Sequence, residues 1–129
     1  MSARVIHVSA AVITDDAGRL LLVRKAGTTA FMQPGGKPEP GESAAETLSR
    51  ELEEEIGVRI PVAELRPLGS FTAHAANEPG FLVVAEVFEA DLAGAAPVIA
   101  AEIEELRWVT AEDAGDLEIA PLARTYFLG

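Results

Sequence analysis

The segment Ala44–Ile56 most constrains the fold of this chain, because it carries both end signals of an α-helix and one apolar stripe. Ser43 is typical of an N-cap, Glu46 three positions later completes a capping box, and Gly57 is typical of a helix stop. At about 100° per residue, the apolar side chains fall on one arc. These residues are Ala45, Leu48, Leu52 and Ile56. We therefore expect a core packed against one side of this helix.

Three glutamates of the same helix lie beside the apolar stripe. Glu51, Glu54 and Glu55 share roughly a 100° arc, because residues at i, i+3 and i+4 lie on one helix face. Neighbouring carboxylates repel one another, but together they supply the oxygen ligands that a hard cation such as Mg²⁺ prefers. Arg50 flanks the arc and could hold one carboxylate by a bidentate pair. Taken alone, the helix fits an acidic solvated face and a metal site equally well.

Short apolar runs separated by turn residues predict that most of the remaining chain is β-structure. Val5–Thr14 and Leu20–Arg24 flank a turn at Asp15–Arg19, which predicts a β-hairpin. Further strands are expected at Leu65–Ala73, Phe81–Ala90 and Leu106–Val109, a loop at Gly27–Glu42, and short helices at Thr110–Ala114 and Pro121–Leu128. Strands outnumber helices and do not alternate with them regularly. This favours an α+β fold with a mixed sheet over a doubly wound parallel sheet.

Length and composition favour one domain, over residues 1–129, and exclude several classes of protein. Without cysteine, the chain has no thiolate nucleophile, redox pair or Cys-based zinc site. No signal-peptide core is present near the N-terminus, and no apolar run approaches the ~20 residues that span a bilayer. We therefore expect a cytoplasmic protein without a membrane partner. The net charge of −11 argues against a nucleic-acid polymer as partner.

The loop and the helix together carry one spaced motif. It consists of Gly36, then Glu42, then the run Arg50–Val58, which reads Arg-Glu-Leu-Glu-Glu-Glu-Ile-Gly-Val. The pattern glycine, five residues, glutamate, seven residues, Arg-Glu-apolar-x-Glu-Glu-x-Gly-apolar is the signature of the Nudix hydrolases, and every position fits. The chain therefore resembles the Nudix hydrolase family, tightly over this motif and more loosely in the order of its elements.

The resemblance implies the Nudix fold, an α/β/α sandwich around a mixed β-sheet, with the loop and helix as the catalytic platform. It also implies a role for each matching residue. Glu54 and Glu55 correspond to the main Mg²⁺ ligands, with the Gly36 carbonyl as a further ligand. Glu51 corresponds to a metal-site acid that serves as general base in some members. Arg50, like Glu42, corresponds to a residue that orients the carboxylates.

A further acid in this family often comes from a downstream loop, a few residues before a tryptophan. Glu102, six residues before Trp108, is the best match, and Glu104 and Glu105 are its rivals. The expected metal ligands are thus Gly36, Glu51, Glu54, Glu55 and Glu102, and the expected catalytic residues are Arg50, Glu51, Glu54, Glu55 and Glu102. The sequence does not choose between Glu51 and Glu102 as the general base.

Six residues are candidates for binding substrate: Arg24, Lys25, Gly35, Gly36, His74 and Asn77. The two cations end an expected strand near the loop, where they either clamp a phosphate or remain solvated. The two glycines allow the backbone to approach a ligand closely. The histidine and asparagine lie in a polar loop that is a candidate wall of the pocket, although lone histidines are more often structural or surface residues.

The resemblance implies a Mg²⁺-dependent hydrolase, with Mn²⁺ as a substitute metal, that cleaves a phosphoanhydride bond in a nucleoside diphosphate derivative. Marks typical of the coenzyme A, ADP-ribose, dinucleoside polyphosphate and NADH branches are absent, which leaves a nucleoside triphosphate cleaved to monophosphate and pyrophosphate. Removal of damaged nucleotides is a candidate role.

The alternatives are an ADP-ribose or nucleotide-sugar pyrophosphatase and a non-catalytic nucleotide-sensing module. An isopentenyl diphosphate isomerase is disfavoured because that chemistry relies on a catalytic cysteine. Family members are often homodimers, which suggests the same assembly here.

Overall fold

The computed structural model describes residues 4–128 and consists of two sheets and two α-helices. Residues 1–3 and 129, which the expected single domain over 1–129 includes, lie outside the described residues. The elements are β1 (Arg4–Val12), β2 (Leu20–Lys25), β3 (Gly35–Gly36), α1 (Ala44–Ile56), β4 (Arg66–His74), β5 (Phe81–Glu89), β6 (Ile103–Val109) and α2 (Pro121–Tyr126), with 3₁₀ turns at Val62–Glu64 and Asp113–Asp116.

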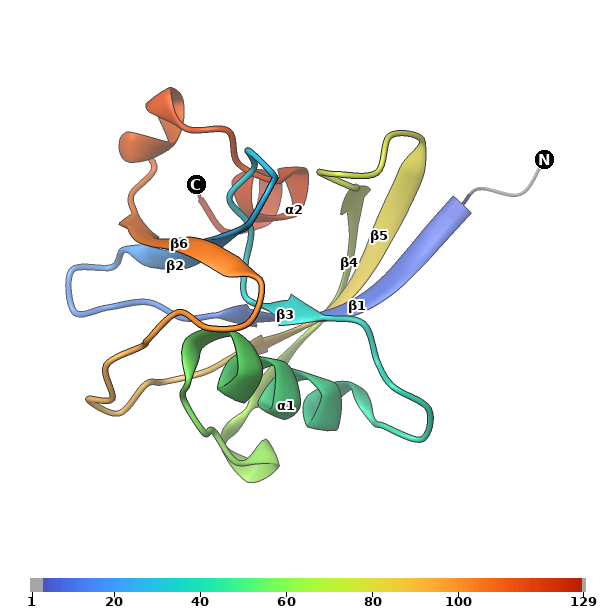
Figure 1. Ribbon diagram of the computed structural model, residues 1–129, viewed down its shortest axis with the longest axis vertical. Helices are drawn as coiled ribbons and strands as arrows, with labels where there is room; N and C mark the ends of the chain where they lie inside the picture. The colour runs from blue at the N-terminus through green and yellow to red at the C-terminus, as the bar shows by residue number, and fades with distance from the viewer. Residues whose placement is uncertain (1–3, 129) are drawn as a thin grey trace.

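The larger sheet is mixed, as expected. Its strand order is β3-β1-β5-β4, in which β1 runs parallel to β5 and antiparallel to β3, and β4 runs antiparallel to β5. Strands β2 and β6 form a separate antiparallel pair. In Figure 1, α1 and α2 lie on opposite sides of the strands, with α1 next to β3. The arrangement is the α+β fold with a mixed sheet that was expected from the sequence.

The predicted hairpin between the first two strands is wrong beyond its turn. Asp15 N donates to Arg19 O at 3.0 Å, and one bridge joins Thr14 to Leu20. The strands then separate, because β5 pairs with β1 along its whole length and β6 pairs with β2. The local turn fixes where the chain reverses, but the partners of each strand come from the second half of the sequence.

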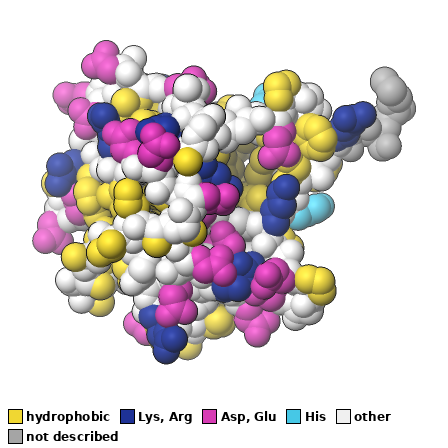
Figure 2. Space-filling model, in the orientation of Figure 1, with side chains coloured by type: hydrophobic (Ala, Val, Ile, Leu, Met, Phe, Trp, Pro, Cys, Tyr) yellow, Lys and Arg dark blue, Asp and Glu magenta, His cyan; other side chains and the backbone are white. Residues whose placement is uncertain are grey.

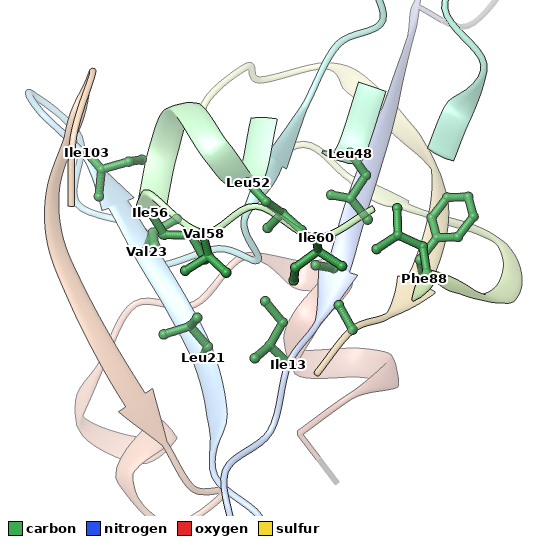
Figure 3. Close-up of a cluster of buried hydrophobic side chains, with 13 residues drawn as sticks. Ile13, Leu21, Val23, Leu48, Leu52, Ile56, Val58, Ile60, Phe88 and Ile103 are labelled. Carbon is green, nitrogen blue, oxygen red and sulfur yellow. The ribbon is translucent and has the colours of Figure 1, made fainter. Parts of the chain in front are cut away.

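Helix α1 spans the predicted residues, and both caps are present. Ser43 Oγ accepts from Glu46 N at 3.1 Å, Glu46 Oε1 accepts from Ser43 N at 2.8 Å, and Gly57 adopts a left-handed φ of 67°. Figure 3 shows the apolar face of this helix packed onto the strands: Leu48, Leu52 and Ile56 meet Ile13, Leu21, Val23 and Phe88. This packing fixes the rotation of the helix, and therefore the direction of its glutamates.

Other expected elements differ from the structure at their ends. The expected Gly27–Glu42 loop contains the short strand β3, and β6 begins at Ile103 because the pairing with β2 continues past a bulge. The helix expected at Thr110–Ala114 is instead a 3₁₀ turn at Asp113–Asp116, and α2 ends at Tyr126. Within residues 4–128, no helix has both the length and the apolarity that crossing a membrane requires.

Truncation of a core residue of α1 tests this packing. Leu52 is fully buried, so Leu52→Ala should lower the free energy of unfolding by about 2–5 kcal/mol, because it removes buried methyl groups and leaves a cavity. Urea unfolding followed by circular dichroism measures this change. The control is Val98→Ala, which truncates a side chain that is 67% exposed and should cost far less. Equal losses in the two variants would contradict the assigned core.

Candidate active site

Two adjacent glycines bring the Gly27–Glu42 loop against both β1 and α1. Gly35 pairs with Ala10, and Gly36 pairs with Ser9. A Cβ atom on Gly35, which has a φ of 152°, would overlap the carbonyl oxygen of Ser9, and one on Gly36 would overlap the Glu51 carboxylate. A side chain at Gly35 would therefore push the loop away from β1, and one at Gly36 would displace the Glu51 carboxylate. The double glycine is the contact that joins the loop to the carboxylates.

Glu55 is a buried carboxylate directly behind this contact. Its side chain is only 2% exposed, and Oε1 accepts a hydrogen bond from Gly35 N at 3.0 Å. Oε2 is buried and has no hydrogen-bond partner among the described residues. Burial raises the pKa of Glu55 to about 7, and the hydrogen bond from Gly35 offsets only part of this rise. An unpaired buried oxygen is costly in any fold, so a ligand that binds Oε2 would relieve this cost.

Arg50 holds the neighbouring carboxylates in place. Its Nε and Nη2 donate to the two oxygens of Glu42 at 2.7 and 3.0 Å, a bidentate pair. Its Nη1 donates to Glu51 Oε1 at 2.6 Å and to Glu54 Oε2 at 3.3 Å. The hydrogen bonds from Arg50 are the main reason that the pKa of Glu42 falls to about 2, whereas burial raises the pKa of Glu51 despite the same guanidinium. Arg50 thus offsets the repulsion expected on this helix face.

A cavity of about 620 Å³ opens beside these residues. Figure 2 shows a hollow above the acidic and basic side chains that gather over α1. The charged part of the wall consists of Lys25, Lys37, Glu39, Arg50, Glu51, Glu54, Glu78 and Glu102. The apolar part includes Ile6, Val8, Ala10, Met32, Val83, Ala120, Leu122 and Ala123, and the one aromatic ring among the described lining residues is the imidazole of His74. The cavity therefore has a charged end and an aliphatic end.

The structure brings most of the predicted substrate-binding residues to this cavity. Lys25 lies in its wall with both glycines, and so do His74 and Asn77 from the end of β4 and the following loop. Arg24 does not line it. Its guanidinium instead pairs with Glu104 at 3.3 Å and Glu105 at 3.2 Å.

The three candidate downstream acids also differ in whether they line the cavity. Glu102 lies in the cavity wall and pairs with Lys25 at 3.2 Å. Its two rivals, Glu104 and Glu105, are engaged with Arg24 outside the cavity. The geometry therefore favours Glu102 as the acid that a ligand in the cavity would meet.

Sequence reasoning missed several polar cavity residues, among them Ser9, Gln33, Lys37 and Glu39. Lys37, which directly follows the double glycine, adds an exposed cation at the charged end. Gln33 is a buried amide in the wall. A polar residue between the apolar Met32 and Pro34 was a visible signal for Gln33, but sequence alone could not show that it is buried.

The carboxylates fit a divalent cation in chemistry, although they are not gathered around one point. Among residues 4–128, no group of three or more acidic or histidine side chains is arranged to hold a metal ion as the side chains stand. Arg50 contacts Glu51 and Glu54 instead. One observation still favours an ion, because Glu55 Oε2 is buried and lacks a partner among the described residues. An all-oxygen donor set of this kind suits Mg²⁺.

The sequence as a whole is similar to known proteins. The family model described as NUDIX domain matches residues 4–127. The chain is 39% identical over 69 residues to the 8-oxo-dGTP diphosphatase of Haemophilus influenzae, a match that covers 50% of this chain and 51% of that protein. It is 29% identical over 111 residues to a MutT-like protein of Streptomyces ambofaciens, which covers 86% of this chain and 67% of that protein. The chain thus spans about half to two thirds of these relatives.

Solved structures agree with the sequence comparison. The crystal structure of the MutT protein from Methanosarcina mazei Go1 has a TM-score of 0.77 and 27% identity, and the match covers 98% of this chain and 93% of that one. The MutT NUDIX hydrolase from Burkholderia pseudomallei has a TM-score of 0.69 and 27% identity, with 85% and 86% covered. Both matches extend well beyond the motif.

The buried carboxyl of Glu55 predicts a pH dependence of stability in EDTA, where no divalent cation is bound. Because folding raises its pKa from 4.5 to about 7, the folded state binds this proton more tightly. The stability that Glu55 contributes is therefore fully present below pH 4.5 and is lost as the pH rises through 7. Glu55→Gln should remove this loss, about 3 kcal/mol in size, between pH 4 and 8. Thermal melts across this range measure the effect, and parallel curves for mutant and wild type would contradict it.

Proposed function

The chain belongs to the Nudix family, and we propose that this protein is a Mg²⁺-dependent pyrophosphohydrolase that cleaves a nucleoside triphosphate to monophosphate and pyrophosphate. The observation that carries the proposal is the two-ended cavity. Its charged end offers carboxylates for a metal–polyphosphate, and its aliphatic end offers room for a sugar and base. The similarity to the 8-oxo-dGTP diphosphatase of Haemophilus influenzae favours the same substrate class and a role in removing damaged nucleotides.

The helix and its loop would supply the metal ligands. Glu51, Glu54 and Glu55 would hold the ion with the Gly36 carbonyl and Glu102, and Mn²⁺ would replace Mg²⁺ because it accepts the same oxygen ligands. When bound, the ion neutralises phosphate charge and lowers the pKa of the attacking water. This accounts for how a chain with a net charge of −11 would accept a polyanionic substrate.

Other residues would orient the carboxylates and the phosphates. Arg50, itself fixed by Glu42, holds Oε1 of Glu51, so that Oε2 remains beside Gly36. Lys25 lies close enough to the charged end to donate to a phosphate, for which it would exchange its ion pair with Glu102.

The proton of the attacking water would go to a carboxylate in the wall. Glu51 and Glu102 both line the cavity, which supports keeping both as candidates for the general base. Glu51 is held by Arg50, whereas Glu102 is 61% exposed in its side chain and pairs with Lys25. Release of Lys25 to a phosphate would leave the Glu102 carboxylate without that partner.

Substitution of one proposed metal ligand tests the site. Glu54→Gln should lower Mg²⁺-dependent turnover at least ~100-fold without loss of the fold, because it removes a ligand charge. Turnover is measured by product release from a panel of nucleoside triphosphates, ADP-ribose and nucleotide sugars with Mg²⁺ or Mn²⁺. Pyrophosphate as the released product supports the triphosphate assignment.

The neighbouring glutamate provides a matched control. Glu53 lies on the same helix but outside the cavity wall, where it pairs with Arg59 at 3.0 Å. Glu53→Gln removes the same charge and should leave turnover within about 2-fold of wild type, as expected for a surface change. Equal turnover in the Glu54 variant and wild type on every substrate would refute the site assignment.

A further inference from the structure

The loop that joins β5 to β6 ends in a turn with an unusual backbone conformation. Among residues 4–128, Ala93 and Ala101 are the only non-glycine residues with a positive φ. Ala101 has a φ of 54°, in the left-handed region that residues with a Cβ seldom occupy. Ile103 N donates to Ala100 O at 3.1 Å, which closes a β-turn with Ala101 and Glu102 at its centre. In turns with a positive φ only at the first central residue, glycine normally takes that place.

The chain before this turn is attached to the C-terminal end of α1. Val98 N donates to Ile56 O at 2.8 Å, and Ala100 N donates to Glu55 O at 3.0 Å. These bonds satisfy two of the carbonyl groups that the end of a helix leaves without intrahelical partners. They also fix the start of the turn relative to the helix that carries the glutamates of the site.

The chain after the turn is attached to β2. The backbone oxygen of Glu102 accepts from Ala26 N at 2.8 Å, and Ile103, which is buried, pairs with Lys25. Because both ends are fixed, the hand of the turn decides the direction in which its central side chains leave the backbone. The left-handed conformation of Ala101 therefore sets the direction of Glu102.

Little besides this turn holds the Glu102 carboxylate in the cavity wall. Its side chain is 61% exposed, so packing does not fix it, and its ion pair with Lys25 at 3.2 Å is of the exposed kind that contributes little. Ala101 itself is exposed and is not among the residues that line the cavity. Substitutions at such surface positions ordinarily change little. An effect of this residue on the site would therefore act through the backbone.

We propose that Ala101 is a positioning residue, whose left-handed backbone directs the Glu102 carboxylate into the cavity that the acids of α1 also line. The inference rests on the proposed function, because it takes Glu102 to act on a ligand bound in the cavity. Disfavoured backbone conformations persist only where the surrounding structure enforces them. Here the enforcing contacts are the hydrogen bonds to α1 and to the end of β2.

The test compares side chains that differ in their tolerance of a positive φ. A β-branched residue, as in Ala101→Val, is an outlier in this conformation, whereas glycine adopts it freely. The kcat of each variant is measured with Mg²⁺ and the nucleoside triphosphate that wild type cleaves fastest. Ala101→Val should lower kcat ~10-fold or more, as Glu102→Gln should, and Ala101→Gly should stay within ~3-fold of wild type.

A double variant shows whether the effect passes through Glu102. If it does, adding Ala101→Val to Glu102→Gln should lower kcat by less than ~3-fold, because the carboxylate is already absent. A loss as large as that of Ala101→Val in wild type would show that the two residues act independently, and would overturn the proposal. Equal kcat in Ala101→Val and wild type would also overturn it.

Ala93 provides a matched control for the strain itself. It has a φ of 52° and is exposed, but it does not line the cavity. Ala93→Val imposes the same conformational penalty and should leave kcat within ~2-fold of wild type. Thermal melting reports whether each variant folds, and Ala101→Leu, which is not branched at Cβ, replaces Ala101→Val if that variant does not. Equal losses of kcat in the two valine variants would indicate general destabilisation and overturn the proposal.

Crystal structures of the variants separate this inference from the hydrolase proposal. If wild type cleaves none of the nucleotides, the proposed activity fails, but the direction of Glu102 can still be measured. A Glu102 carboxylate that leaves the cavity wall in Ala101→Val and stays there in Ala101→Gly supports the inference. A carboxylate that keeps its place beside Lys25 in both variants overturns it.

Discussion

The close contact of Gly35 and Gly36 with β1 and α1 is the constraint on which the site depends. At Gly35 the loop backbone pairs with β1 so closely that no Cβ fits, and at Gly36 a Cβ would displace the Glu51 carboxylate. The backbone N–H of Gly35 also donates a hydrogen bond to Oε1 of Glu55. A single backbone segment therefore connects the sheet, the helix and its carboxylates, and any shift of the loop would move all three together.

The glutamates of α1 differ in whether a positive group compensates their charge. Arg50 compensates Glu42, Glu51 and Glu54 through four hydrogen bonds at the cavity side of the helix. Glu55 receives one backbone hydrogen bond and remains buried with an unpaired oxygen. Burial of such a group without a positive partner reduces stability. The fold thus retains one destabilising carboxylate beside the cavity, which is typical of positions kept for binding rather than for folding.

The cavity wall combines two kinds of surface. Cations and carboxylates come from the end of β2, the Gly27–Glu42 loop, α1, the loop between β4 and β5 and the residue before β6, whereas the aliphatic wall comes mainly from β1, β5 and α2. These surfaces meet only because β5 pairs in parallel with β1 and brings the second half of the chain back to the first. Gln33 also lies in this wall, where its amide donates to the carbonyl oxygen of Ala11.

The sequence by itself determined the helix, its caps and the family, because these depend on residues within one short segment. It also predicted α+β character and most strands. Only the tertiary structure decided which strands pair, since a turn at Asp15–Arg19 reverses the chain but does not choose its partners. Likewise, only the fold placed Arg24 and Lys25 in different surroundings and buried Gln33. Arg24 pairs with Glu105, Lys25 pairs with Glu102, and Gln33 donates to the carbonyl oxygen of Ala11. All three partners are far from these residues in the sequence, so local patterns could not reveal them.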